Sequence, residues 1–280
     1  MNIRKRWRRI RLYYKRWSIF KTHLQNPIRA LFLPLISSAR FRAKNGIEFT
    51  VPGDSWFVLP NFVRLASIGA KPSIVDGMKR IEIRNLVLYS PIETNEEGNF
   101  LREIFIEDVY RIRDLDLTGK VVVDIGGYIG DTAIAFGAKG ATVYVLEPSA
   151  RLYSFIQRNI IENQQEFLIH AFPVGLSNKT ETITCSHGGI LNDRIELVDG
   201  IDFVLSKIPT DIEYLKLDCE GCEYHLLGDD RFLAHLKPRR IVMEFHHGLM
   251  ELPQILENAG YRIEIIGGHK QVGYIYAEKM

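Results

Sequence analysis

The sequence is poor in cysteine. Its 280 residues include three, Cys185, Cys219 and Cys222. Three cysteines form no even disulfide framework, so the sequence predicts unpaired thiols in a reducing compartment. This number excludes a small disulfide-stapled scaffold, and 46% hydrophobic residues are enough for a packed globular core.

The chain also lacks a long apolar run. The best candidate, residues 30–36, is interrupted by Pro34 and is far shorter than the roughly 20 residues that span a bilayer. Arginines interrupt the first apolar residues, so no signal peptide is evident. We therefore expect a cytoplasmic protein that is soluble or bound peripherally at a membrane surface.

Acidic residues are absent from the first 47 positions, which carry 13 Lys or Arg. Because the whole chain has a net charge of +2, the remainder is at −11. This asymmetry predicts an anionic partner for the N-terminus. Within residues 1–23, helical spacing places Trp7, Ile10, Tyr14 and Trp17 on one face with a basic periphery. Such a helix suits an anionic membrane surface, while a nucleic acid backbone and packing against the protein itself are alternatives.

The length allows one α/β domain with a smaller appendage. We predict a basic, aromatic helical segment over residues 1–45, a small β-rich cap over 46–97 and the main domain over 98–280. Turn-forming residues divide the cap into predicted strands at 46–51, 56–59 and 80–89. Apolar residues at helical spacing predict a helix over 99–113, packed beside the first strand of the main domain.

The most informative stretch is residues 120–148, KVVVDIGGYIGDTAIAFGAKGATVYVLEP. Its apolar start predicts a buried parallel strand, and the glycines at 126, 127 and 130 allow a tight turn and close approach of a ligand. A helix then begins near Asp131, and a second strand ends at Glu147. Since Glu147 follows Asp124 by 23 residues, both carboxylates are expected at one edge of the sheet, as in a nucleoside-binding site.

Two nucleoside cofactors compete for this layout. A dinucleotide fingerprint requires G-x-G-x-x-G, but the position of its first glycine is occupied by Ile125. S-adenosylmethionine carries an ammonium, a sulfonium and a ribose diol, and carboxylates suit these groups better than they suit a pyrophosphate. The residues therefore favour S-adenosylmethionine, with Asp124 near its amino acid end and Glu147 accepting from the ribose hydroxyls.

Strand and helix patterns alternate after residue 148, and the last two strands form an antiparallel hairpin. The predicted order is a helix at 150–163, a strand at 167–174, a polar excursion to about 192, a strand at 213–219, a helix from 223, a strand at 240–246, a helix at 251–259 and strands at 261–266 and 272–277. This pattern predicts an α/β fold with a Rossmann-like, seven-stranded and mostly parallel sheet, in which one strand near the C-terminus is reversed.

A second group of ionisable residues surrounds the strand at 213–219. Ligands bind beyond the carboxyl ends of strands in open α/β sheets, where Asp218, Glu220, Glu244 and His246 should converge. One of them can take a proton from a substrate hydroxyl, and histidine is the natural base near neutral pH. A divalent cation held by these groups and pairing of the acids with Lys216 are alternatives.

The cysteines permit a further interpretation. The spacing of Cys219 and Cys222 is that of a redox pair, and together with Cys185 and His187 these cysteines have the residue types that bind zinc. Cys219 nevertheless falls on the apolar side of its strand and Cys222 opens a helix, where cysteine serves as a small buried residue. We favour this packing role and predict no metal ligand.

Several of these motifs resemble those of the FkbM-type S-adenosylmethionine-dependent methyltransferases. The matching segments are DIGGYIGDT, VLEP, the final N of RNIIEN, LKLDCEGCE and MEFHH, with FIEDVYRIRDLDLTGK resembling the segment before the first strand. The resemblance covers about residues 98–250. It implies a class I methyltransferase fold, S-adenosylmethionine as cofactor, and O-methylation of a sugar, glycan, glycolipid or other small hydroxyl compound.

The resemblance also implies roles for individual residues. Gly127 and Tyr128 stand where the family pattern D-x-G-A-N-x-G has alanine and asparagine. The predicted catalytic residues are Asp218, Glu220 and His246. The predicted cofactor-binding residues are Asp124, Gly126, Gly127, Tyr128, Gly130, Asp131, Glu147 and Pro148.

Two other functions use the same fold. The basic N-terminus can guide a nucleic acid methyltransferase, although the sequence lacks the N-P-P-[FY] motif of enzymes that act on exocyclic base nitrogens. Alternatively, the chain is a membrane-recruited module that binds a nucleoside without turnover.

Overall fold

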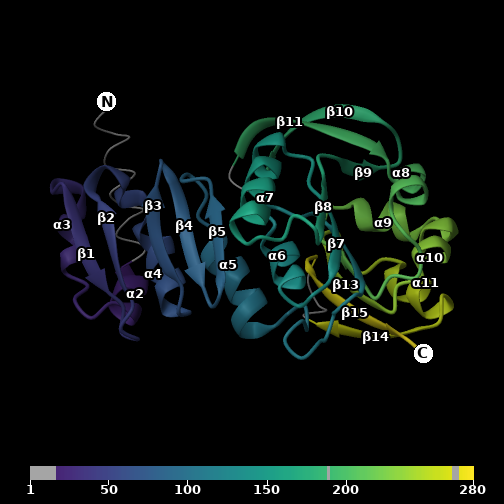
Figure 1. Ribbon diagram of the computed structural model, residues 1–280, viewed down its shortest axis with the longest axis horizontal. Coiled ribbons are helices and arrows are strands. Elements are labelled where there is room, and N and C mark those ends of the chain that lie inside the picture. Colours follow the sequence, from purple (N-terminus) through teal and green to yellow (C-terminus); the bar gives the residue numbers. More distant parts are fainter. Residues whose placement is uncertain (1–16, 188–189, 267–270) are drawn as a thin grey trace. The chain divides into compact units, whose positions relative to one another are not determined.

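The computed structural model (Figure 1) describes residues 17–187, 190–266 and 271–280, with the side chains of 185–192 excluded. The chain forms two compact units, one ending at Val109 and the other running from Tyr110 to Met280. The boundary that the sequence predicted between 97 and 98 falls inside a helix of the first unit. Trp7, Ile10 and Tyr14 of the predicted amphipathic helix lie outside the described residues.

The N-terminal unit combines short helices with two antiparallel sheets, β1-β2 and β3-β4-β5. Its helical elements are α2 (Trp17–His23), α3 (Arg29–Phe32), η1 (Leu33–Leu35), η2 (Gly53–Val58), α4 (Leu59–Ser67), α5 (Glu97–Arg102) and the π-helical turn η3 (Glu103–Glu107). Its strands are β1 (Ser38–Arg42), β2 (Glu48–Pro52), β3 (Lys71–Val75), β4 (Met78–Ile83) and β5 (Leu86–Ser90).

Three predictions for this unit are wrong. The single strand expected at 80–89 is two antiparallel strands, β4 and β5, separated by a turn in which Arg84 has a φ of +53°. The expected strand at 56–59 forms the end of η2 and the start of α4, because Pro60 favours the first turn of a helix and the residues after it bury one helical face. The helix expected over 99–113 ends at Glu107, where Asp108 adopts a left-handed backbone conformation. It packs on α4, since the backbone N–H of Gly98 donates to Asn61.

A buried ion pair joins the strands and helices of the N-terminal unit. Lys79 on β4 and Glu97 on α5 are completely buried, and Nζ lies 2.7 Å from Oε1. Asn61 of α4 donates to the other carboxylate oxygen at 2.6 Å, and Lys79 also donates to Thr94. These contacts satisfy the charged groups within the protein, as burial of charge requires.

The second unit is built on the seven-stranded sheet β14-β15-β13-β12-β6-β7-β8. Strand β15 is antiparallel to both neighbours, whereas β6, β7, β8, β12 and β13 are parallel. The predicted α/β sheet with one reversed strand is therefore confirmed. Its strands are β6 (Val121–Ile125), β7 (Thr142–Leu146), β8 (Ile169–Phe172), β12 (Tyr214–Leu217), β13 (Arg240–Phe245), β14 (Tyr261–Ile266) and β15 (Gly273–Lys279).

Helices connect the strands, and a small second sheet fills the predicted polar excursion (Figure 1). This sheet has the order β10-β11-β9. The helices are α6 (Asp131–Gly137), α7 (Ala150–Glu162), α8 (Gly200–Lys207), α9 (Cys222–Leu227), α10 (Asp230–Leu236) and α11 (Leu252–Asn258), and the added strands are β9 (Gly175–Ser177), β10 (Glu181–His187) and β11 (Ile190–Asp199). No helix within the described ranges is long and apolar enough to cross a membrane.

Alternation along the central strands gives the two faces of the sheet different chemistry. On one face, Val123, Ile125 and Leu217 join an apolar core that includes residues of α8 to α11. On the other face, Asp124 and Lys216 are direct register partners on β6 and β12. Lys216 Nζ lies 2.9 Å from Asp124 Oδ1 and donates to the carbonyl of Gly126 at 2.8 Å.

The energetic weight of this ion pair can be measured. Replacing Lys216 by Met leaves the buried carboxylate of Asp124 without its cation, and removal of one partner of a buried pair costs about 3–5 kcal/mol. We expect urea denaturation to show a loss of this size for Lys216→Met. The same change at the exposed Lys207 should leave the free energy of unfolding unchanged. Equal stabilities of the two variants would contradict the prediction, and Asp124→Leu combined with Lys216→Met should recover part of the loss.

Candidate cofactor and acceptor site

The glycine turn after β6 brings the two sequence motifs together. Gly126 has a φ of +89°, and a Cβ at this position would lie 1.7 Å from the carbonyl oxygen of Asp218. Gly126 and Gly127 also donate their backbone N–H groups to the carbonyl of Leu146 at 3.1 and 2.9 Å. Only a residue without a side chain allows the ends of β6 and β12 to approach this closely.

Glu147, at the end of β7, is held by the backbone of the same turn. Its side chain accepts from the N–H of Tyr128 through Oε2 and from that of Ser149 through Oε1, both at 2.9 Å. Tyr128 adopts a φ of +50° to present its N–H. Only 4% of Glu147 is exposed, and burial raises its pKa to about 7, although the two N–H groups oppose this rise. Each oxygen keeps a lone pair for a further donor.

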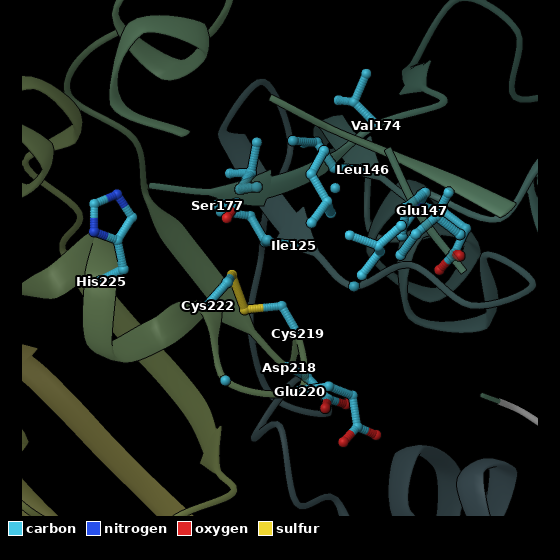
Figure 2. A pocket seen from close by; sticks show the side chains of 18 of the residues that line it. Ile125, Leu146, Glu147, Val174, Ser177, Asp218, Cys219, Glu220, Cys222 and His225 are labelled. Atoms are coloured by element: carbon cyan, nitrogen blue, oxygen red, sulfur yellow. A yellow bond between two sulfur atoms is a disulfide. The ribbon is translucent and has the colours of Figure 1, made fainter. Parts of the chain in front are cut away.

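A cavity of about 610 Å³ opens at the carboxyl ends of β6, β7 and β12. Figure 2 shows Ile125, Leu146, Glu147, Asp218 and Glu220 among its lining residues. Of the eight predicted cofactor-binding residues, Gly126, Glu147 and Pro148 line this cavity. Its volume lies in the range of roughly 300–1,000 Å³ found for small-molecule sites.

Asp124 and Asp131 lie on either side of the glycine turn in the sequence and are not among the residues that line the cavity. Asp124 is completely buried, accepts from the hydroxyl of Thr132 and pairs with Lys216. Asp131 accepts from the N–H of Thr132, and burial raises its pKa to about 7. The expectation that Asp124 reaches the cofactor's amino acid end stays a prediction, whereas its contact with Lys216 is observed.

The β10–β11 hairpin supplies a part of the cavity that the sequence did not reveal. Ile183, Ile195 and Leu197 line it, together with His225 of α9. The sequence predicted only a polar excursion between the strands here. The alternation of apolar and polar residues at 193–197 is typical of a half-buried strand. No neighbouring residue in the sequence indicates that this strand forms a wall of the cavity.

Cys219 and Cys222 form a disulfide in the cavity wall (Figure 2). The prediction of unpaired thiols is therefore wrong. Gly221, with a φ of +117°, turns the chain between the end of β12 and the start of α9 and brings the two sulfurs together. The backbones of Cys185 and His187 belong to β10, but their side chains lie outside the described part of the chain.

His246 stands at the end of β13 among carboxylates. Its Nδ1 lies 3.1 Å from Oε1 of the fully buried Glu223, which also accepts from the His246 N–H at 3.2 Å. The other ring nitrogen, Nε2, lies 3.7 Å from Asp218 Oδ1 and 3.7 Å from Glu220 Oε2. The three predicted catalytic residues therefore converge, and Glu223 is an orienting residue that the sequence analysis did not select.

These neighbours change the proton affinity of the imidazole. Burial by itself lowers the pKa of His246, but the hydrogen bond with Glu223 and the charges of Glu220, Glu223 and Asp218 outweigh it and raise the pKa to about 9. His246 is then an imidazolium near neutral pH and cannot accept a proton there. Asp218 lines the cavity, and a carboxylate at that position can accept a proton from a substrate hydroxyl.

The same cluster can hold a cation. Asp218, Glu244 and His246 each offer a ligand atom, and these atoms lie within 4.8 Å of one another. His246 would have to lose its proton to bind a metal. Carboxylate and imidazole ligands suit several divalent metals. The cluster also carries more carboxylates than cationic groups, so it favours any positive group placed beside Asp218.

The residues present fit S-adenosylmethionine. The cavity offers a buried carboxylate for a diol, apolar side chains for a flat base and an acidic rim for cationic groups. Glu147 would hold the ribose, Ile125 and Leu146 would contact the nucleoside, and the absence of a side chain at Gly126 leaves room for the ligand. When bound, the cofactor supplies an electrophilic methyl group on its sulfonium.

This fold and site define an S-adenosylmethionine-dependent methyltransferase. The model of the methyltransferase FkbM domain matches residues 124–263, and the chain belongs to this family. The family uses S-adenosylmethionine as its methyl donor. A comparison with curated protein sequences gave no match.

Solved structures with a similar arrangement include three bacterial or archaeal proteins. A precorrin-6y C5,15-methyltransferase from Geobacter metallireducens is 17% identical, with a TM-score of 0.41 over 62% of this chain and 87% of its own. TYW2 from M. jannaschii, solved with AdoMet, is 14% identical, with a TM-score of 0.44 over 74% and 89%. TrmK from M. capricolum, solved with S-adenosyl-homocysteine, is 13% identical, with a TM-score of 0.41 over 61% and 67%. Similarity at this level carries no information about the acceptor.

The pKa of Glu147 predicts how pH affects cofactor binding. The ionised carboxylate accepts from two hydroxyls, whereas the protonated form cannot accept both. We expect the Kd of S-adenosylhomocysteine to rise about tenfold from one pH unit above the pKa of Glu147 to one unit below it. Isothermal titration calorimetry measures this. Glu147→Gln should bind weakly with little pH dependence, and an unchanged profile in that variant would assign the titration to another group.

The disulfide predicts a redox dependence. Its reduction releases the link between the end of β12 and α9, so Asp218 and Glu220 lose a constraint on their positions. We expect dithiothreitol to weaken S-adenosylhomocysteine binding several-fold, while the Cys219→Ser/Cys222→Ser variant binds weakly with or without reductant. Alkylation followed by mass spectrometry should modify Cys219 and Cys222 only after reduction. Their modification without reductant would show that the bond is absent in solution.

Proposed function

We propose that the protein transfers a methyl group from S-adenosylmethionine to a hydroxyl oxygen of a sugar, glycan, glycolipid or other small metabolite. The observation that carries this proposal is the convergence of His246 with Asp218 and Glu220, two carboxylates that line the cofactor cavity. A hydroxyl acceptor needs a group that removes its proton as the methyl–oxygen bond forms, and an ionised carboxylate at the rim can do so.

In this proposal, the residues of the cluster have different tasks. Asp218 accepts the hydroxyl proton, and Glu220, whose side chain is 79% exposed, contacts the acceptor. His246, held by the buried Glu223, places its Nε2 3.7 Å from Asp218 Oδ1 and so orients that side chain beside the acceptor. The apolar side chains of the β10–β11 hairpin cover the other wall and contribute to acceptor choice.

The basic N-terminal segment is the feature that supports the alternative function, methylation of a nucleic acid. Phosphate contacts by lysines and arginines support nucleic acid binding, but the residues after the first 47 are net acidic. This charge disfavours a long phosphate track across the methyltransferase unit. We propose instead that residues 1–23 contact an anionic membrane surface and that the protein is cytoplasmic and peripheral.

A methyl-release assay tests the proposed chemistry. Radiolabelled S-adenosylmethionine is incubated with the full chain and a cell extract, and the labelled product is treated with nuclease and with mild acid. We expect a nuclease-resistant product, from which mild acid releases a labelled sugar when the acceptor is a glycan or a glycolipid. A product degraded by nuclease would favour the nucleic acid alternative, and absence of transfer despite S-adenosylhomocysteine binding would favour the non-catalytic module.

The proposed role of Asp218 has its own test. Asp218→Asn should lower kcat about 10²- to 10⁴-fold, which is the usual contribution of a general base, while the Kd of S-adenosylhomocysteine changes little. Asp202→Asn, on the exposed start of α8, is the matched control and should retain full activity. A normal kcat in Asp218→Asn would remove Asp218 from the proton transfer.

A further inference from the structure

The N-terminal unit displays large apolar side chains to solvent within a short stretch of chain. Ile28 is 59% exposed, Phe32 54%, Leu35 71% and Ile36 41%. They lie on and beside α3 and η1, and Phe57 of η2 is 36% exposed. We call these five residues the apolar face. Scattered single apolar residues are ordinary on a protein surface, but a continuous set marks an interaction site.

The backbone of this region keeps the apolar face together. Ala30 and Leu33 are completely buried and attach the segment to the unit, which turns the remaining apolar residues outward. The N–H of Gly53 donates to the carbonyl of Ser37 at 2.8 Å, and a Cβ at Gly53 would lie 1.7 Å from the carbonyl oxygen of Ile36. Phe57 belongs to η2, which starts at Gly53 and packs against η1.

Basic side chains accompany the part of the apolar face at residues 28–36, whereas η2, which carries Phe57, also has the exposed acidic residue Asp54. Lys21 and Arg29 are exposed in the same segment, and no acidic residue occurs before Glu48. Arg40 and Arg42 form ion pairs with Glu48, whereas Lys21 and Arg29 belong to the stretch of the sequence that has no acidic residue. Apolar side chains bordered by lysine and arginine match the headgroup boundary of an anionic bilayer.

We propose that the apolar face inserts into the surface of an anionic lipid bilayer and docks the N-terminal unit there. This inference rests on the membrane contact proposed for residues 1–23 and locates a second, folded contact that follows them in the chain. Leu35 and Phe32 enter the acyl boundary, while Lys21 and Arg29 remain at the headgroups. Each basic residue near such a surface contributes about 1 kcal/mol, and the buried apolar area adds to it.

Vesicle flotation tests this surface. The full chain is mixed with vesicles of phosphatidylcholine, or of phosphatidylcholine and phosphatidylserine, and its distribution is measured over a range of lipid concentrations. We expect binding to the anionic vesicles that weakens with salt. Phe32→Glu/Leu35→Glu should reduce the partition coefficient at least tenfold. Both side chains are exposed, so the far-ultraviolet circular dichroism and the thermal midpoint should not change.

A matched control uses an exposed aromatic residue outside the apolar face. Phe167 of the methyltransferase unit is 95% exposed, and Phe167→Glu should bind vesicles as the wild type does. Equal binding of Phe32→Glu/Leu35→Glu and the wild type would overturn the inference while leaving the proposed contact of residues 1–23 intact. Failure of the wild type to bind would overturn both.

A second copy of the chain is the competing occupant. If the apolar face paired two chains, sedimentation equilibrium would show a wild-type dimer and a Phe32→Glu/Leu35→Glu monomer without lipid, and this result would overturn the inference. A monomer in both cases, combined with lipid binding that only the wild type and Phe167→Glu retain, supports it.

Discussion

The site depends on the buried ion pair between Lys216 and Asp124. Because these residues are register partners on β12 and β6, the pair links the strand before the glycine turn to the strand before the acidic motif. Lys216 also donates to the carbonyl of Gly126. Burial disfavours its charge, but Asp124 and Asp218 raise the pKa of Lys216, so the cation persists where only its partners solvate it. One ammonium group thus positions the turn, the supporting carboxylate and the edge of the acceptor site.

Around this pair, some carboxylates are occupied by cationic side chains, whereas others line the cavity and can contact a ligand. Asp124 and Glu223 are fully buried and occupied by Lys216 and by His246, respectively. Glu147, Asp218 and Glu220 line the cavity. Such a division suits transfer from a sulfonium, because fixed negative charge near a cationic donor favours its binding, while a positioned base remains at the rim. The raised pKa of His246 belongs to the same arrangement, since three carboxylates outweigh the effect of its burial.

The two units contribute different functions under this view. The methyltransferase unit contains the family motifs, the cavity and the hairpin whose apolar residues form one wall. The N-terminal unit has its own core, closed by Lys79 and Glu97, and presents the apolar face. A protein with such a surface would meet its acceptor at a membrane, which is consistent with a glycolipid or a membrane-associated glycan among the proposed acceptors.

The sequence by itself determined the sheet, the glycine turn and the position of Glu147, because periodicity, glycine and strand-ending residues act over a few neighbouring positions. The helix at 59–67 was missed because the aromatic and β-branched residues before Pro60 favour a strand when considered alone. Only the tertiary structure decided that Asp124 pairs with Lys216, that Glu223 orients His246 and that β10 and β11 line the cavity. These contacts join residues far apart in the chain, and burial, which sets the proton affinities of Glu147 and His246, exists only once the strands have packed.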